Sequence, residues 1–211
     1  MKPSHYVAID PGHSGGIVML SASGETCQAW PMPTVKDKTV TEVDKTALFD
    51  VLNRLSKLPA VSAGVEWPAA WPGTFGNVAR DATAFGKGLG VLDTMMWFVF
   101  NGHKRISPVA WKQRLGLPGK TDDPKSVQGH ALWNASYPKH KGLVLGPRGG
   151  LQDGILDAAL ICHYLRLGGE SPVGHKGGRR PPIYRTAGMD NPLKDWMDNL
   201  AIPHDELLPP Q

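Results

Sequence analysis

The hydrophobic positions near the amino terminus fall into short runs that are separated by turn residues. His5 to Asp10 has the apolar alternation of a buried strand. The Pro- and Gly-rich segment 11–16 predicts a turn, after which Ile17 to Leu20 and Thr26 to Trp30 predict two more strands. Because short turns join these strands, the pattern predicts an antiparallel meander.

A helical pattern then separates the meander from a fourth strand. Asp44 is a candidate N-cap for a helix over Lys45 to Lys57, which Pro59 ends. The apolar run from Ala60 to Glu66 predicts the fourth strand, and the polar segment 34–43 shows no period. A helix between two strands is a crossover unit, so we expect the fourth strand to pair in parallel.

The second half of the chain is mainly helical, with a short strand at Lys104 to Ser107. The predicted helices cover Thr74 to Phe100, Val109 to Leu115, Pro124 to Tyr137 and Leu151 to Leu167. The sequence therefore predicts an α/β domain over residues 1–167, built on a mixed sheet that helices flank. Residues 168–211 are rich in Pro and Gly and predict an extended tail with a short helix.

The composition is that of an ordinary globular chain. Of its 211 residues, 41% are hydrophobic, which is enough for a core and argues against disorder. No apolar run approaches the ~18 residues of a membrane span, and the first one meets Asp10 too early for a signal peptide. The two cysteines match no disulfide framework or metal spacing, so we expect a cytoplasmic protein.

Positive charge is concentrated in one segment. The net charge is +4, but residues 103–148 hold nine Lys and Arg against two Asp, a net +7 that leaves −3 for the remainder. Such asymmetry favours contact with a polyanion, although most exposed lysines are merely solvated.

Four acidic residues stand at positions where the predicted fold can bring them together. Asp10 and Glu66 end two strands, and Asp153 and Asp157 share one face of the last helix, with Cβ atoms about 6 Å apart. Clustered carboxylates need protons or cations, and oxygen ligands without His or Cys favour Mg²⁺ or Mn²⁺. Two such ions about 4 Å apart support phosphodiester hydrolysis.

Each of these acids also has a simpler explanation. Asp10 could be a turn residue before Pro-Gly, and Asp153 could be an N-cap. Such explanations fit the other two acids less well. Glu66 lies between apolar residues and needs a partner, and Asp157 has apolar neighbours all round. The order of two strand-end acids followed by a helical pair is more specific than any single residue.

Four segments carry a resemblance to a known family. They are Ala8 to Gly12, Val65 to Glu66, Ser107 to Lys112 continuing through Lys125 to Gln128, and Asp153 to His163. Together they resemble the RuvC-type Holliday-junction resolvases of the RNase H-like superfamily. The resemblance implies a five-stranded mixed sheet and a homodimer that makes paired nicks in a four-way DNA junction.

The resemblance also implies roles for individual residues. Asp10, Glu66, Asp153 and Asp157 would hold two Mg²⁺ ions, for which Mn²⁺ would substitute. Lys112 would lie beside the site as a catalytic residue, and Lys125 would contact the DNA backbone. An aromatic residue of the loop after Glu66, Trp71 or Phe75, would insert into the junction. The remaining candidate DNA contacts are Lys104, Arg105, Arg114, Lys120, Lys139, Lys141 and Arg148.

Two features depart from the family pattern. The family commonly spaces its helical aspartates three apart, whereas here they are four apart and Gly154 stands at the third position. The tail from Gly168 is longer than in cellular members, which suggests a phage or divergent member in a bacterial or phage-infected cell.

Other functions fit parts of the same pattern. Residues 10–16 could form the phosphate loop of an actin-like phosphotransferase or ATPase, but a second phosphate motif is missing from the sequence. A non-catalytic DNA-binding module would not need all four acids. An RNase H-type activity on other nucleic acids would use the same acids, so the acids alone do not distinguish it.

Overall fold

The computed structural model describes residues 2–37, 40–67, 79–117 and 125–169. The chain divides into two units, 1–174 and 175–211, and every described residue belongs to the first. Trp71, Phe75 and Lys120 lie outside the described residues, as does the predicted tail beyond residue 169.

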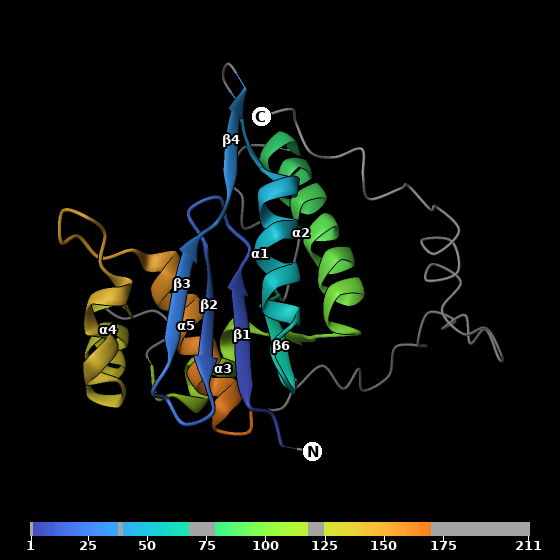
Figure 1. Ribbon diagram of the computed structural model, residues 1–211. Helices are drawn as coiled ribbons and strands as arrows, with labels where there is room; N and C mark the ends of the chain where they lie inside the picture. The colour runs from blue at the N-terminus through green and yellow to red at the C-terminus, as the bar shows by residue number, and fades with distance from the viewer. Residues whose placement is uncertain (1, 38–39, 68–78, 118–124, 170–211) are drawn as a thin grey trace, which may run out of the picture. The chain divides into compact units, whose positions relative to one another are not determined.

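Five strands form the central sheet, in the order β3-β2-β1-β6-β7 (Figure 1). Their bounds are β1 His5–Asp10, β2 Gly16–Ser21, β3 Cys27–Pro31, β6 Val61–Glu66 and β7 Lys104–Ile106. The first three strands pair antiparallel, whereas β6 pairs in parallel with β1 and with β7. The predicted five-stranded mixed sheet, with antiparallel and parallel pairs, is therefore confirmed.

Helices cover both faces of this sheet. Helices α1 (Lys45–Ser56) and α2 (Ala79–Phe100) pack on one face, and α5 (Asp153–Arg166) packs on the other with α3 (Pro108–Arg114) and α4 (Lys125–Ser136) (Figure 1). A short 3-10 helix, η1 (Pro138–Val144), lies between α4 and α5, within the basic segment 103–148.

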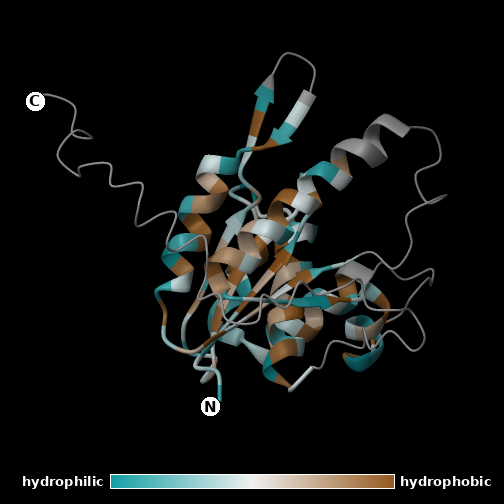
Figure 2. Cartoon of the chain, turned by 90° about the vertical axis from the view of Figure 1, so that its right-hand side faces the viewer, coloured by the Kyte–Doolittle hydropathy of each residue, from teal (hydrophilic) through white to brown (hydrophobic). Residues whose placement is uncertain are grey.

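Alternate residues of the central strands supply two separate cores. Val7 and Ile9 of β1 pack with α1 and α2, whereas Ala8 packs with α5 and with two buried tryptophans, Trp111 and Trp133. This division follows from the alternation of side chains along a strand. In Figure 2, hydrophobic residues gather in the middle of the domain, and most hydrophilic ones lie at its margins.

The structure contains a hairpin that the sequence pattern does not predict. Strands β4 (Thr34–Asp37) and β5 (Val40–Val43) pair antiparallel and extend beyond the main sheet (Figure 1). Val35 is 51% exposed, so the hairpin does not bury one continuous apolar face. Without such a face, the segment lacks the alternation that reveals a strand.

The helix boundaries follow local chemistry. The Asp44 carboxylate accepts a hydrogen bond from the backbone N–H of Ala47 at 3.0 Å, which confirms the predicted N-cap of α1. Within the described ranges, no helix is long and apolar enough to cross a membrane.

Candidate metal centre

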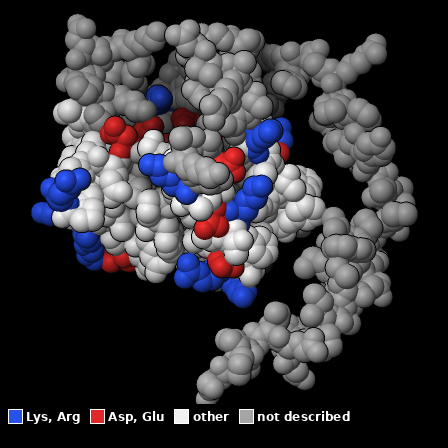
Figure 3. Space-filling view, turned by 90° about the horizontal axis from the view of Figure 1, so that it is seen from above, with Lys and Arg blue, Asp and Glu red and all other residues white. Residues whose placement is uncertain are grey.

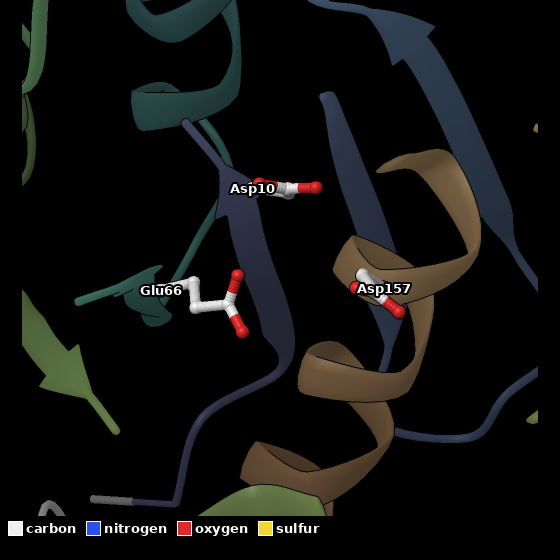
Figure 4. A group of neighbouring side chains, drawn as sticks. All are labelled: Asp10, Glu66 and Asp157. Carbon is white, nitrogen blue, oxygen red and sulfur yellow. The ribbon is translucent and has the colours of Figure 1, made fainter. Parts of the chain in front are cut away.

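Three carboxylates from separate segments meet at one edge of the sheet. Asp10 ends β1, Glu66 ends β6, and Asp157 lies in the second turn of α5. Each can offer one oxygen such that the three oxygens lie within 4.8 Å of one another. Figure 4 shows the three side chains directed toward a common space between the two strands and the helix.

The parallel pairing of β1 with β6 explains how the first two acids meet. Ile9 is paired with Val65, so Asp10 and Glu66 are the next residues along both strands. Their carboxylates therefore leave the sheet at the same edge. The Asp10 Oδ1 atom also accepts a hydrogen bond from the backbone N–H of Gly12 at 3.3 Å, which links its orientation to the following turn.

Backbone packing between two glycine-containing segments brings the third acid to this edge. Gly15, in the turn between β1 and β2, forms an isolated parallel bridge with Gly154 in the first turn of α5. A Cβ atom on Gly154 would approach the Ser14 carbonyl oxygen more closely than 3.0 Å. A Cβ on Gly16 would lie 2.8 Å from Ile155 Cγ1. Only glycines allow α5 to lie this close to the turn, one helical turn before Asp157.

The two helical aspartates occupy different environments. Asp157 is only 6% exposed and belongs to the acidic cluster. Asp153 is exposed at the first position of α5 and is not one of the three clustered acids. Gly154, three residues before Asp157, packs on backbone and leaves no space for a side chain. Asp153 as a further metal ligand stays a prediction.

Helix α3 contributes a contact to the acidic cluster that the sequence analysis missed. Trp111 is fully buried, and its indole N–H donates a hydrogen bond to Glu66 Oε1 at 3.0 Å. A tryptophan that is buried in an otherwise polar helix turn needs a hydrogen-bond acceptor for its indole N–H. The sequence does not say which acceptor it meets.

Lys112 follows Trp111 and is partly buried. Its ammonium nitrogen lies 5.1 Å from the centroid of the Trp111 ring. Lys112 thus lies beside the residue that donates to Glu66. Its catalytic role stays a prediction.

Arg105 is engaged within the protein. Its guanidinium donates two hydrogen bonds to the Asp93 carboxylate, at 3.0 and 2.6 Å, and lies 4.2 Å from the centroid of the Trp67 ring. His103 also lies within 2.9 Å of Asp93. Burial lowers the pKa of His103, an effect that the Asp93 charge opposes. These contacts connect β7 to α2, so a DNA contact by Arg105 would compete with them.

The other predicted DNA contacts differ in their surroundings. Lys104 donates to the Gly169 carbonyl at 3.2 Å, and Lys139 pairs with Glu25 at 2.5 Å. Three further residues are exposed, namely Arg114, Lys141 and Arg148. Lys125 begins α4. In Figure 3, lysines and arginines form several separate groups, with acidic residues between them.

The donor set of the acidic cluster suits a hard divalent cation. Three carboxylates that lie this close repel one another unless protons or a cation compensate them. They offer oxygen atoms only, and Asp157 is nearly inaccessible to water. These residues could hold a metal ion, and oxygen ligands favour Mg²⁺ or Mn²⁺ over Zn²⁺.

Comparisons with known proteins give structural similarity only. No protein-family model matches the chain, and no curated protein matches it. A structure of RuvC from Thermus thermophilus is 18% identical, with a TM-score of 0.48, and the match covers 80% of this chain and 99% of that chain. A structure of T. thermophilus RuvC in complex with Holliday junction substrate is 14% identical, with a TM-score of 0.46, covering 81% and 99%. Both structures are of RuvC, and both matches extend over most of this chain.

Proposed function

We propose that this protein is a metal-dependent endonuclease that cuts branched DNA, with the four-way junction as its main substrate. The observation that carries the proposal is the convergence of Asp10, Glu66 and Asp157 from three distant segments. Burying a carboxylate within such a cluster destabilises the fold unless a cation or a proton compensates its charge, and such arrangements are typical of functional sites. The basic segment 103–148 provides charge of the sign that a nucleic acid requires.

The residues of the cluster would share the work of phosphodiester hydrolysis. Asp10, Glu66 and Asp157 would hold two Mg²⁺ ions, with Mn²⁺ as a substitute and Asp153 as a further ligand. Bound Mg²⁺ supplies a more acidic water and stabilises charge on the attacking and leaving oxygens. Lys112 would offset negative charge that develops on the phosphate. Water adds across the bond between phosphorus and the 3′ oxygen, which leaves a 5′-phosphate and a 3′-hydroxyl.

Other basic residues would hold the DNA without reading its sequence. Contacts from lysine and arginine to phosphate set the position of the substrate. Among the candidates whose side chains the structure describes, Arg114, Lys141 and Arg148 are exposed. Lys125, at the start of α4, is a further candidate. Such a nuclease would act in the cytoplasm of a bacterial or phage-infected cell.

We expect cutting of a labelled four-way junction that requires Mg²⁺ and produces paired nicks. Asp10→Asn and Glu66→Gln should each abolish cutting but retain junction binding, because each removes a metal ligand without removing a DNA contact. Gels of labelled junction, fork, duplex and RNA–DNA hybrid, run with and without Mg²⁺, measure how much of each substrate is cut. Gel-shift assays on the junction measure binding. Asp50→Asn, an exposed aspartate of α1, is the matched control and should cut normally.

Two outcomes of the same assay would favour the alternative functions. Preferential degradation of the RNA–DNA hybrid would indicate an RNase H-type nuclease. ATP turnover in the absence of DNA would indicate a phosphotransferase or ATPase of the actin-like fold. Full activity of both acidic-cluster variants on the junction would contradict the proposed centre.

We further propose that the active form is a homodimer. Paired nicks in opposed strands need two centres, and the described part of one chain contains a single cluster of this kind. Trp97 and Phe98 of α2 are 62% and 55% exposed, and a second copy would bury them. Light scattering should give twice the 22.8 kDa chain mass. Trp97→Glu should give a monomer, whereas Val127→Glu, at an exposed apolar position of α4, should not.

A further inference from the structure

The hydrogen bond between Trp111 and Glu66 connects the buried core to the acidic cluster. Trp111 has no exposed surface and lies in the same core cluster as Ala158 and Ile161, neighbours of Asp157 on α5. Its indole N–H reaches Glu66 Oε1 at 3.0 Å. The indole is a donor only and does not titrate, so it cannot be a metal ligand. It can therefore hold the carboxylate in place without binding the metal itself.

A second buried tryptophan shows that this partner is not a requirement of burial alone. Trp133 is 1% exposed and packs in the same core cluster. Its indole N–H donates to the backbone carbonyl of His140 at 3.2 Å. A backbone carbonyl is therefore a sufficient hydrogen-bond acceptor for a buried indole N–H in this core. The N–H of Trp111 instead meets a side chain of the acidic cluster.

We propose that Trp111 is a positioning residue for Glu66, an inference that rests on the proposed metal centre. A glutamate side chain has several rotatable bonds, so its carboxylate needs partners to hold it in one orientation. A donor fixed at Oε1 restricts that orientation, and the carboxylate can still present an oxygen to Asp10 and Asp157. Groups that orient metal ligands commonly affect metal affinity 10- to 100-fold when they are removed.

Helix α3 holds the donor in place. The helix begins at Pro108, directly after β7, the strand that pairs with β6. The Lys112 ammonium lies over the Trp111 ring, so the same helix turn supports the residue that orients Glu66 and the candidate phosphate contact. Because Trp111 also packs in the same core as Ala8 of the sheet, the variant that tests its N–H must keep an aromatic ring.

The test is metal binding by the full chain in the absence of DNA. We expect Trp111→Phe, which keeps an aromatic ring but removes the N–H, to weaken Mn²⁺ binding in calorimetry by about 10-fold or more. Trp133→Phe removes an equally buried indole N–H and should bind Mn²⁺ with unchanged affinity. Asp10→Asn, which removes a ligand, should weaken binding more than either.

A spectroscopic measurement on the unaltered protein gives an independent result. The indole N–H groups of the seven tryptophans each give one ¹H–¹⁵N signal. After sequential assignment, the Trp111 signal should shift when Mg²⁺ is added, because its acceptor then becomes a metal ligand. The Trp133 signal should not shift. This measurement stands even if the Trp111→Phe variant fails to fold.

The outcomes separate this inference from the proposed metal centre. Unchanged Mn²⁺ affinity in Trp111→Phe, with loss in Asp10→Asn, would overturn the positioning role and leave the centre intact. Equal weakening in Trp111→Phe and Trp133→Phe would also overturn it, since the cause would be general damage to the core. Absence of Mn²⁺ binding by the unaltered protein would contradict the centre and this inference with it.

Discussion

Replacing Asp157 with Asn is expected to reduce Mg²⁺-dependent cutting of a four-way junction by about 10³-fold or more, a barrier increase of roughly 4 kcal/mol. Asp157 is buried, and one of its oxygens lies within 4.8 Å of those of Asp10 and Glu66. The amide has nearly the same shape but no charge, so it is a poor ligand for a hard cation. Initial rates on labelled junction, with enzyme in excess, measure the effect.

The same substitution four residues earlier is the matched control. Asp153→Asn changes an exposed acid on the same helix, outside the cluster of three. Its effect on the cutting rate should therefore be much smaller, on the order of 10-fold if Asp153 acts on the metal only through a water molecule or another ligand. Equal losses in the two variants would show that both aspartates bind metal directly. A greater loss in Asp153→Asn would assign the helical ligand to Asp153 and contradict the arrangement proposed here.

Stability separates a lost ligand from a damaged fold. Neutralising one of three neighbouring carboxylates reduces their mutual repulsion when no metal is present. The metal-free Asp157→Asn protein should therefore unfold at a urea concentration no lower than that of the unaltered protein. A large fall in that concentration would mean that the lost activity reflects unfolding.

The acidic cluster could be predicted from sequence because regular elements place its members. Asp10 and Glu66 each follow an apolar run, and parallel pairing brings the ends of such strands to one edge. Asp157 was identifiable because a charged residue amid apolar helical neighbours needs a functional reason. These inferences use only the periods of strands and helices.

Contacts between distant side chains could not be predicted in the same way. Arg105 meets Asp93, twelve positions earlier, only because β7 lies beside α2. Trp111 meets Glu66 across 45 positions. Charge alone suggested a DNA contact for Arg105, and burial alone would suggest a core role for Trp111. In both cases the partner follows from how elements pack, which the local pattern does not encode.

The separation of the two helical aspartates depends on a glycine whose importance the sequence did not reveal. The resemblance to RuvC-type resolvases would place an acid three residues before Asp157, and the sequence has Gly154 there. In the structure, a Cβ at this position would meet backbone atoms of Ser14 and Gly15. Backbone atoms cannot rotate away as a side chain can, so the space is closed to every other residue.

Gly154→Ala should therefore lower the free energy of unfolding by about 3 kcal/mol, the upper range for an added methyl group in a closely packed site. Helix propensity alone predicts the opposite sign, since alanine favours a helix over glycine by about 1 kcal/mol. Urea unfolding measures the change. Gly142→Ala is the control, because a Cβ there meets nothing within 4 Å, and its effect should stay within about 0.5 kcal/mol.

Metal binding should weaken together with this loss of stability. Relief of the clash requires α5 to move away from the turn between β1 and β2, and Asp157 moves with the helix, whereas Asp10 stays with the sheet. Even under conditions in which Gly154→Ala remains folded, we expect its Mn²⁺ affinity to fall about 10-fold or more. Normal stability and normal affinity in this variant would show that the turn, not the helix, yields to the added methyl group. The close backbone approach would then not be what holds Asp157 beside Asp10.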